Sequence, residues 1–183
     1  MMEAARMIAK SGAKPKRTIL FIGFAGEEFG LLGAQAWVKA HKDKLPKIAN
    51  LFNRDGGPEP PVGISVPQAM YDDFVKISEP IQKIRPDYPF EVKVREPRKR
   101  PTRMGGTDAS VFAIEGVPTL GFTTEDFKGY DFDYGEIWHT ERDLYTKNIP
   151  EYQEHTATVT AIIALGVANL DKQLSREGLY TEE

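Results

Sequence analysis

An uninterrupted apolar run from Thr18 to Gly26 leads directly into the acidic pair Glu27–Glu28. The run does not alternate with polar residues, is rich in β-branched and aromatic side chains, and ends in small residues. These properties are typical of a strand that is buried on both faces of a parallel sheet. Open α/β sheets place ligands and chemistry beyond the carboxyl ends of such strands. The pair is therefore predicted to stand at a functional site, where one carboxylate can hold a metal and its neighbour can move a proton.

The rest of the chain alternates between helical and extended patterns. Further strands are expected over residues 48–53, 90–94 and 117–122, and helices are expected over residues 1–10, 31–40, 68–84, 110–114 and 151–174. Pro80 is expected to kink or interrupt the third of these helices. The alternation predicts an α/β fold with helices on both faces of a mainly parallel or mixed sheet. We expect residues 1–183 to form a single domain.

Composition excludes several classes of protein. The chain has 183 residues, of which 40% are hydrophobic and 28% charged, as in ordinary globular proteins. Its net charge of −3 gives no reason to expect nucleic acid or an anionic membrane as a partner. No apolar segment approaches the roughly 20 residues that span a bilayer. The absence of cysteine excludes disulfides and thiolate metal sites.

Three potential metal ligands each follow an expected strand. They are Glu28, Asp55 and His139, and a parallel sheet would bring all three to the same rim. Carboxylate and imidazole ligands without thiolates suit a hydrolytic zinc better than a structural one. Glu27 is then free to act as a general base. Taken singly, an acidic pair is usually a solvated surface pair and Asp-Gly-Gly-Pro is usually a turn. Their joint placement favours the metal site.

The segments around these residues resemble those of the co-catalytic zinc aminopeptidases, a family that also includes glutamate carboxypeptidases and has glutaminyl cyclases as relatives. The similar segments are residues 24–34, 53–57, 106–112, 116–122 and 139–143. The resemblance implies that Glu27 is the general base and that Glu28 and His139 bind one zinc. It further implies that Asp55 binds the other zinc. Asp108 and Asp143 would then orient the ligands through hydrogen bonds.

The chain also departs from the family pattern. Complete family members supply two more ligands upstream of the acidic pair, a His and an Asp that bridges two zinc ions. The histidines here are His41, His139 and His155. The first helix lacks an N-cap, which fits both a helix cut from a longer chain and a native start that frays. We therefore expect the carboxyl-terminal part of a catalytic domain that is truncated. We also expect this chain to bind one zinc or none, instead of the two of a complete family site.

The expected function is that of a zinc-dependent exopeptidase of the aminopeptidase type, which hydrolyses peptides through metal-activated water. Arg103 is the best candidate contact for a substrate carboxylate, although the basic stretch around it is better explained as a solvated loop. Trp138 replaces a Tyr that assists the transition state in family members, and is a second candidate for substrate binding. The aromatic loop around it either walls a specificity pocket or packs internally. His41 and His155 are expected at the surface.

Two other functions remain open at this level. One is a non-catalytic binding module with a protease-like fold, and the other is a one-zinc acyltransferase similar to glutaminyl cyclases. Apolar surface left by a missing segment predicts self-association or a partner chain. By resemblance the protein would be secreted or periplasmic.

Overall fold

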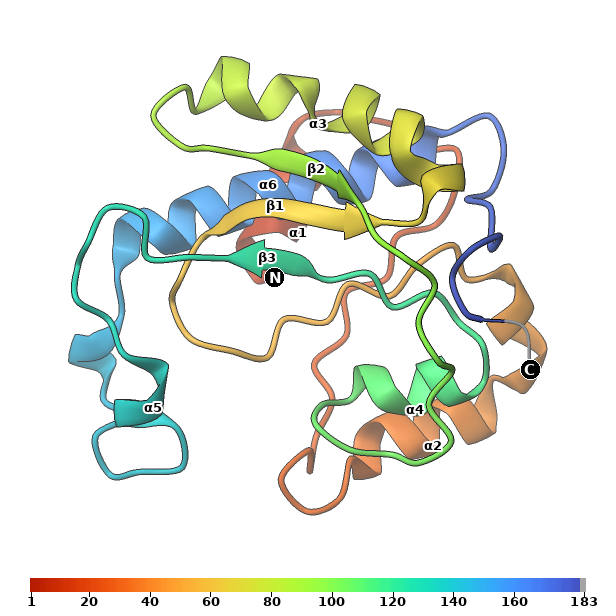
Figure 1. The fold of residues 1–183 in the computed structure, drawn as a ribbon, viewed down its shortest axis with the longest axis horizontal. Coiled ribbons are helices and arrows are strands. Elements are labelled where there is room, and N and C mark those ends of the chain that lie inside the picture. The colour runs from red at the N-terminus through yellow and green to blue at the C-terminus, as the bar shows by residue number, and fades with distance from the viewer. Residues whose placement is uncertain (182–183) are drawn as a thin grey trace.

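The computed structural model describes residues 1–181 and is built around a three-stranded mixed sheet in the order β2-β1-β3 (Figure 1). The central strand β1 (Pro61–Val66) pairs in parallel with β2 (Glu91–Val94) and antiparallel with β3 (Phe122–Thr124). Gly63 is required in β1, because a Cβ atom there would lie 2.4 Å from the carbonyl oxygen of Glu91. The expected mixed α/β class is confirmed.

The helices follow the sequence pattern closely. Their bounds are α1 Met2–Lys10, α2 Leu32–Ala40, α3 Tyr71–Ile84, α4 Ala109–Ile114, α5 Tyr134–Ile137 and α6 Pro150–Asn169. Short 3₁₀ segments cover Lys42–Lys47, Gln68–Met70 and Tyr145–Lys147. Pro80 does not interrupt α3, because it lies on the exposed face, where water can bond the carbonyl that proline leaves unpaired. The last helix ends at Asn169, earlier than expected, and α5 was not predicted.

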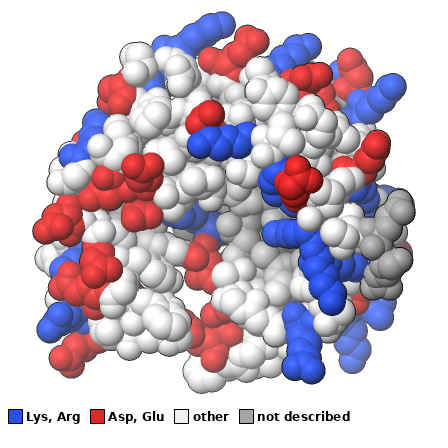
Figure 2. Space-filling model, viewed as in Figure 1, with Lys and Arg blue, Asp and Glu red and all other residues white. Residues whose placement is uncertain are grey.

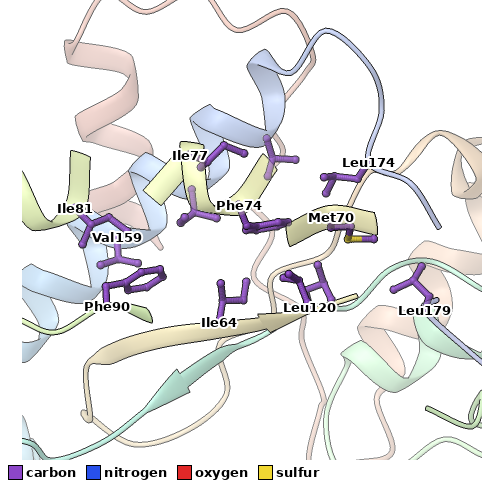
Figure 3. Close-up of a cluster of buried hydrophobic side chains, with 13 residues drawn as sticks. Ile64, Met70, Phe74, Ile77, Ile81, Phe90, Leu120, Val159, Leu174 and Leu179 are labelled. Carbon is purple, nitrogen blue, oxygen red and sulfur yellow. The ribbon is translucent and has the colours of Figure 1, made fainter. Parts of the chain in front are cut away.

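The main core lies between the sheet and helices α3 and α6 (Figure 3). Phe74, Ile77 and Ile81 recur at helical spacing on α3, and all three are buried. They meet Ile64 from β1 and Val159 from α6. Helix α1 packs on α6 (Figure 1). Within residues 1–181, no helix combines the length and apolar character needed to cross a bilayer.

A second apolar cluster joins α2 to α4. Ala34 and Val38 of α2 pack with Val111 and Phe112 of α4. Partly buried residues from outside these helices complete the cluster, among them Phe24, Ile48 and Leu51. Helices α2 and α4 therefore pack mainly on the irregular segments around residues 24 and 48–51, and not on the second face of the sheet as expected.

Two of the expected strands are absent, and the strand expected over residues 117–122 overlaps β3 only at Phe122. Residues 18–26 and 48–53 are not assigned to strands, because neither finds a neighbouring strand within the described part of the chain. Within residues 1–181, no backbone–backbone hydrogen bond involves residues 18–24. Residues 48–53 are held instead by the hydrogen bond from Leu51 N to Pro118 O and by the side chain of Asn50 on Leu120. The prediction of a buried strand at residues 18–26 was wrong for this structure, and Leu20 is 63% exposed.

This unpaired edge gives the self-association expectation a defined test. Residues 18–24 carry no charge, and an uncharged apolar edge is a template for pairing with another chain. We expect the protein to associate as its concentration rises and Leu20→Lys to weaken that association by about tenfold. Sedimentation velocity over a concentration series measures it. The control is Val75→Lys, an exposed apolar residue on α3. Equal association in both variants would contradict the prediction.

Candidate metal centre

The acidic pair sits on a tight turn between the extended run and α2. Gly26 has a φ of +68°, a left-handed conformation that favours glycine. The amide of Gly33 donates to the carbonyl of Ala25 at 2.8 Å. A Cβ atom at Gly33 would lie 2.7 Å from the backbone of Ala25, so the helix begins in direct contact with the end of the run. These glycines set the direction in which Glu27 and Glu28 leave the backbone.

Glu28 and His139 meet although they are far apart in the sequence. The Nε2 atom of His139 lies 3.2 Å from Oε2 of Glu28, and both side chains are more than half exposed. His139 has a φ of +56°, which is uncommon for a residue with a side chain. The ring centroids of the adjacent Trp138 and of His139 lie 4.6 Å apart, and Trp138 is 57% exposed. The predicted ligands of one zinc ion therefore stand side by side.

Glu27 lies among the other acidic residues of the site. Partial burial raises the pKa of its carboxyl, and the charges of Asp55, Glu28 and Asp108 raise it further, while His139 acts in the opposite direction. A carboxylate with a raised pKa is better matched to accepting a proton near neutral pH. The same influences show that Glu27 shares one electrostatic environment with Asp55, Asp108 and the Glu28–His139 pair.

Asp108 is the buried acid of this group. It precedes α4, is 7% exposed, and its Oδ1 atom has no hydrogen-bond partner among the described residues. Burial raises the pKa of Asp108, and the charge of the neighbouring Asp55 adds to this. A buried carboxylate oxygen without a donor is costly. The arrangement thus suits a proton, a water molecule or a cation between Asp108 and Asp55.

A pocket of about 410 Å³ opens beside the acidic pair. Its lining includes Glu27, Glu28 and Leu31 on one side and Met104 to Gly106 on the other. Figure 2 shows a gap between the part of the molecule that contains α5 and the part that contains α2 and α4, with acidic side chains at its edge. Arg103 is exposed next to this lining. Asp143 is also exposed, and within residues 1–181 its side chain makes no hydrogen bond or ion pair.

The donor set matches zinc in chemistry but is small. Imidazole nitrogen and carboxylate oxygen are ordinary zinc ligands, and a catalytic zinc takes three protein ligands. Within residues 1–181, no group of three or more such donors is arranged to hold one ion. Glu28 and His139 are two such donors in contact. That they and Asp55 bind zinc, and that Asp108 and Asp143 orient the ligands, stays a prediction.

The expectation that His155 and His41 lie at the surface needs correction. His155 is fully buried, because its ring stacks on Tyr88 with centroids 3.9 Å apart and its Nε2 lies 3.1 Å from Pro61 O. Part of the aromatic loop packs internally, and whether the rest walls a specificity pocket stays a prediction. Phe127 packs against Tyr88, whereas Trp138 is exposed at the site. His41 is partly buried against Trp37.

Comparison with known proteins gives a consistent result. The model of peptidase family M28 matches residues 1–163. Carboxypeptidase Q of Mus musculus is 24% identical over 179 residues, which cover 95% of this chain and 34% of the relative. A probable zinc metalloprotease of Phaeosphaeria nodorum is 44% identical over 54 residues, which cover 30% of this chain and 10% of the relative. The chain spans about a third of the length of carboxypeptidase Q.

Solved structures share the fold. A peptidase M28 precursor from Shewanella amazonensis superposes with a TM-score of 0.71 at 26% identity, covering 94% of this chain and 36% of that one. The Legionella pneumophila aminopeptidase LapA gives a TM-score of 0.63 at 21% identity, covering 93% of this chain and 44% of that one.

Proposed function

We propose that this chain, which belongs to peptidase family M28, carries the general base and half of the metal site of a zinc-dependent exopeptidase. The observation that carries the proposal is the 3.2 Å contact between Glu28 and His139, with Glu27 directly beside it. An ordinary surface pair gives no reason to expect the neighbouring Glu27, whose pKa is raised by burial and by nearby carboxylates. These carboxylates are Asp55, Glu28 and Asp108. The family is one of metallopeptidases, and the identity of the metal as zinc is part of our proposal.

Each side chain has a distinct role in this proposal. Glu28 and His139 would hold a zinc ion, and Asp55 would contribute to a second one. Zinc, when bound, acts as a Lewis acid that makes a water molecule acidic enough to lose its proton near neutral pH. Glu27 would accept a proton from the attacking water and deliver it to the amine nitrogen that leaves the cleaved peptide bond. Asp108, whose buried Oδ1 has no hydrogen-bond partner within residues 1–181, would orient the group that Asp55 binds.

The substrate would be a peptide cleaved at one end, of the aminopeptidase type. The exposed ring of Trp138 next to His139 offers an apolar face to a substrate side chain. Arg103, exposed beside the pocket, would contact a substrate carboxylate. We also infer a secreted or periplasmic location.

A non-catalytic binding module is the second candidate. The small donor set favours it, since within the described residues no three donors converge on one ion. Zinc binding and peptide hydrolysis separate the two candidates, because only the first requires both. The one-zinc acyltransferase alternative is separated by offering a glutaminyl peptide in the same assay.

Calorimetric titration with zinc is the deciding experiment. We expect one zinc ion at micromolar affinity, about −8 kcal/mol, and a loss of at least about tenfold in both Glu28→Ala and His139→Ala. His41→Ala is the control, because it removes an imidazole that stacks on Trp37 in the α2 region. A folded chain that takes up no zinc, or an equal loss in the control, would contradict the proposal.

A further inference from the structure

We propose that the contact between Gly57 and the ring of Phe132 is a positioning clamp, which fixes the loop that carries His139 against the turn that carries Asp55. The inference rests on the proposed function, since it concerns where the metal donors stand. The two segments carry donors that are predicted for different zinc ions. A contact between them sets their separation without touching substrate or metal.

Aromatic rings approach only one of the two glycines in the turn. A Cβ atom at Gly57 would lie 2.7 Å from Cε1 and Cζ of Phe132 and 3.2 Å from Cδ2 of Tyr134. A Cβ atom at Gly56 would meet only Nη1 of Arg54, at 3.7 Å. Neither glycine has a positive φ. Gly57 is therefore needed for the close approach of the aromatic rings and not for its backbone conformation.

Arg54 holds the turn from its other side. Its Nη2 atom donates hydrogen bonds to the carbonyl oxygens of Gly57 and Glu59, the latter at 2.7 Å. The guanidinium thus closes the turn around the position that Phe132 contacts. A new side chain at residue 57 would have to displace either the ring of Phe132 or the turn that these bonds hold.

The loop is anchored just before Phe132. The carboxylate of Asp126 accepts hydrogen bonds from the amides of Tyr130 at 3.0 Å and Phe132 at 3.3 Å, and from the hydroxyl of Tyr152 on α6 at 2.5 Å. Tyr130 also donates to Glu151 of α6 at 2.6 Å. These bonds tie the backbone of Phe132 to the main core, so its ring is presented to Gly57 from a fixed base.

Little chain separates Phe132 from His139. Helix α5 and Trp138 make the connection, with Ile137 buried at 6% exposure and Glu136 paired to Lys147 at 2.8 Å. A displacement of Phe132 therefore has few places to be absorbed before it reaches His139. The clamp acts on the Glu28–His139 contact through this short connection.

Gly57→Ala tests the clamp, with Gly56→Ala as a matched control that adds the same methyl group one residue away. We expect Gly57→Ala to weaken zinc binding by about tenfold or more and to speed amide hydrogen exchange over residues 131–139. The control should change neither by more than about twofold. The double variant Gly57→Ala/Phe132→Leu removes the clashing ring atoms and should restore slow exchange and zinc affinity relative to Gly57→Ala.

The exchange measurement keeps the clamp separate from the proposed function. If the unaltered protein takes up no zinc, the function fails, while faster exchange in Gly57→Ala and its rescue still support the clamp. Unchanged exchange and affinity in Gly57→Ala, or the same changes in Gly56→Ala, would overturn it. Should Gly57→Ala not fold, the double variant Gly57→Ala/Phe132→Leu should fold and exchange slowly over residues 131–139, and failure of that rescue would overturn the clamp.

Discussion

Glu27→Gln is expected to lower the kcat of zinc-dependent peptide hydrolysis by about 10²–10⁴-fold. Glutamine keeps the size and hydrogen-bonding reach of the side chain but cannot accept a proton at neutral pH. Glu27 is partly buried beside Asp55 and Asp108, a setting that favours proton acceptance over solvated charge. Its neighbour Glu28 makes the contact with His139, so the substitution leaves both donors of that pair in place.

The measurement is the hydrolysis of an aminoacyl p-nitroanilide by the zinc-loaded protein, with zinc affinity measured on the same samples. The affinity of Glu27→Gln should stay within about threefold of the unaltered protein, because neither donor changes. Glu141→Gln, an exposed acid two residues beyond His139, is the control and should retain full activity. Activity that falls only in proportion to zinc affinity would assign Glu27 to the metal and not to proton transfer. No hydrolysis by any sample would favour the binding-module alternative.

The local parts of the fold were predictable from the sequence. Helix α3 was expected from the spacing of Phe74, Ile77 and Ile81, and all three are buried. Strand β2 was expected from the alternation over residues 90–94, and the strand covers Glu91–Val94. Periodicity reports which face of an element meets the core, and that information is local.

Pairing between strands was not predictable in the same way. The run at residues 18–26 has the composition of a buried strand, but a strand also needs neighbours, and the described part of the chain supplies none. Strand β1 was missed because Pro60, Pro61 and Gly63 indicate a turn. The structure shows that Pro61 is the first residue of the strand, where proline is tolerated, and that Gly63 allows the close approach of β2.

In the site, too, the local sequence pattern indicates some residues, whereas contacts between distant segments could not be predicted. Motif positions led to Glu28 and His139, and the structure brings these two side chains into contact. The pattern gave no indication of the role of Gly57, because the ring that contacts it comes from Phe132, far along the chain. The burial of His155 was likewise hidden, since it depends on Tyr88 from the segment between α3 and β2. Contacts of this kind are set by tertiary packing and not by local pattern.

His155 makes stability depend on pH. Burial lowers the pKa of His155 to about 4 from its ordinary value of 6.5, with Arg85 and Lys128 acting in the same direction and Asp87 and the Pro61 carbonyl opposing them. The folded protein therefore keeps the ring neutral, while the unfolded chain takes up a proton below about pH 6.5. Since the unfolded state binds more protons, the free energy of unfolding falls as pH is lowered from about 6.5 to about 4, by about 3 kcal/mol from this group.

His155→Phe should remove this dependence. Phenylalanine keeps the stacking on Tyr88, loses the hydrogen bond to Pro61 O and cannot be protonated. Urea unfolding between pH 4 and pH 7 should show that the free energy of unfolding depends less on pH in the variant. The loss of stability accumulated from pH 7 downwards should differ most between the two proteins at pH 4. His41→Phe is the control and should keep the original slope, because it leaves His155 in place. Carboxylates also titrate near pH 4, but both proteins share them, so the difference between the two curves isolates His155. Parallel curves over the whole range would show that the buried ring is not held neutral by the fold.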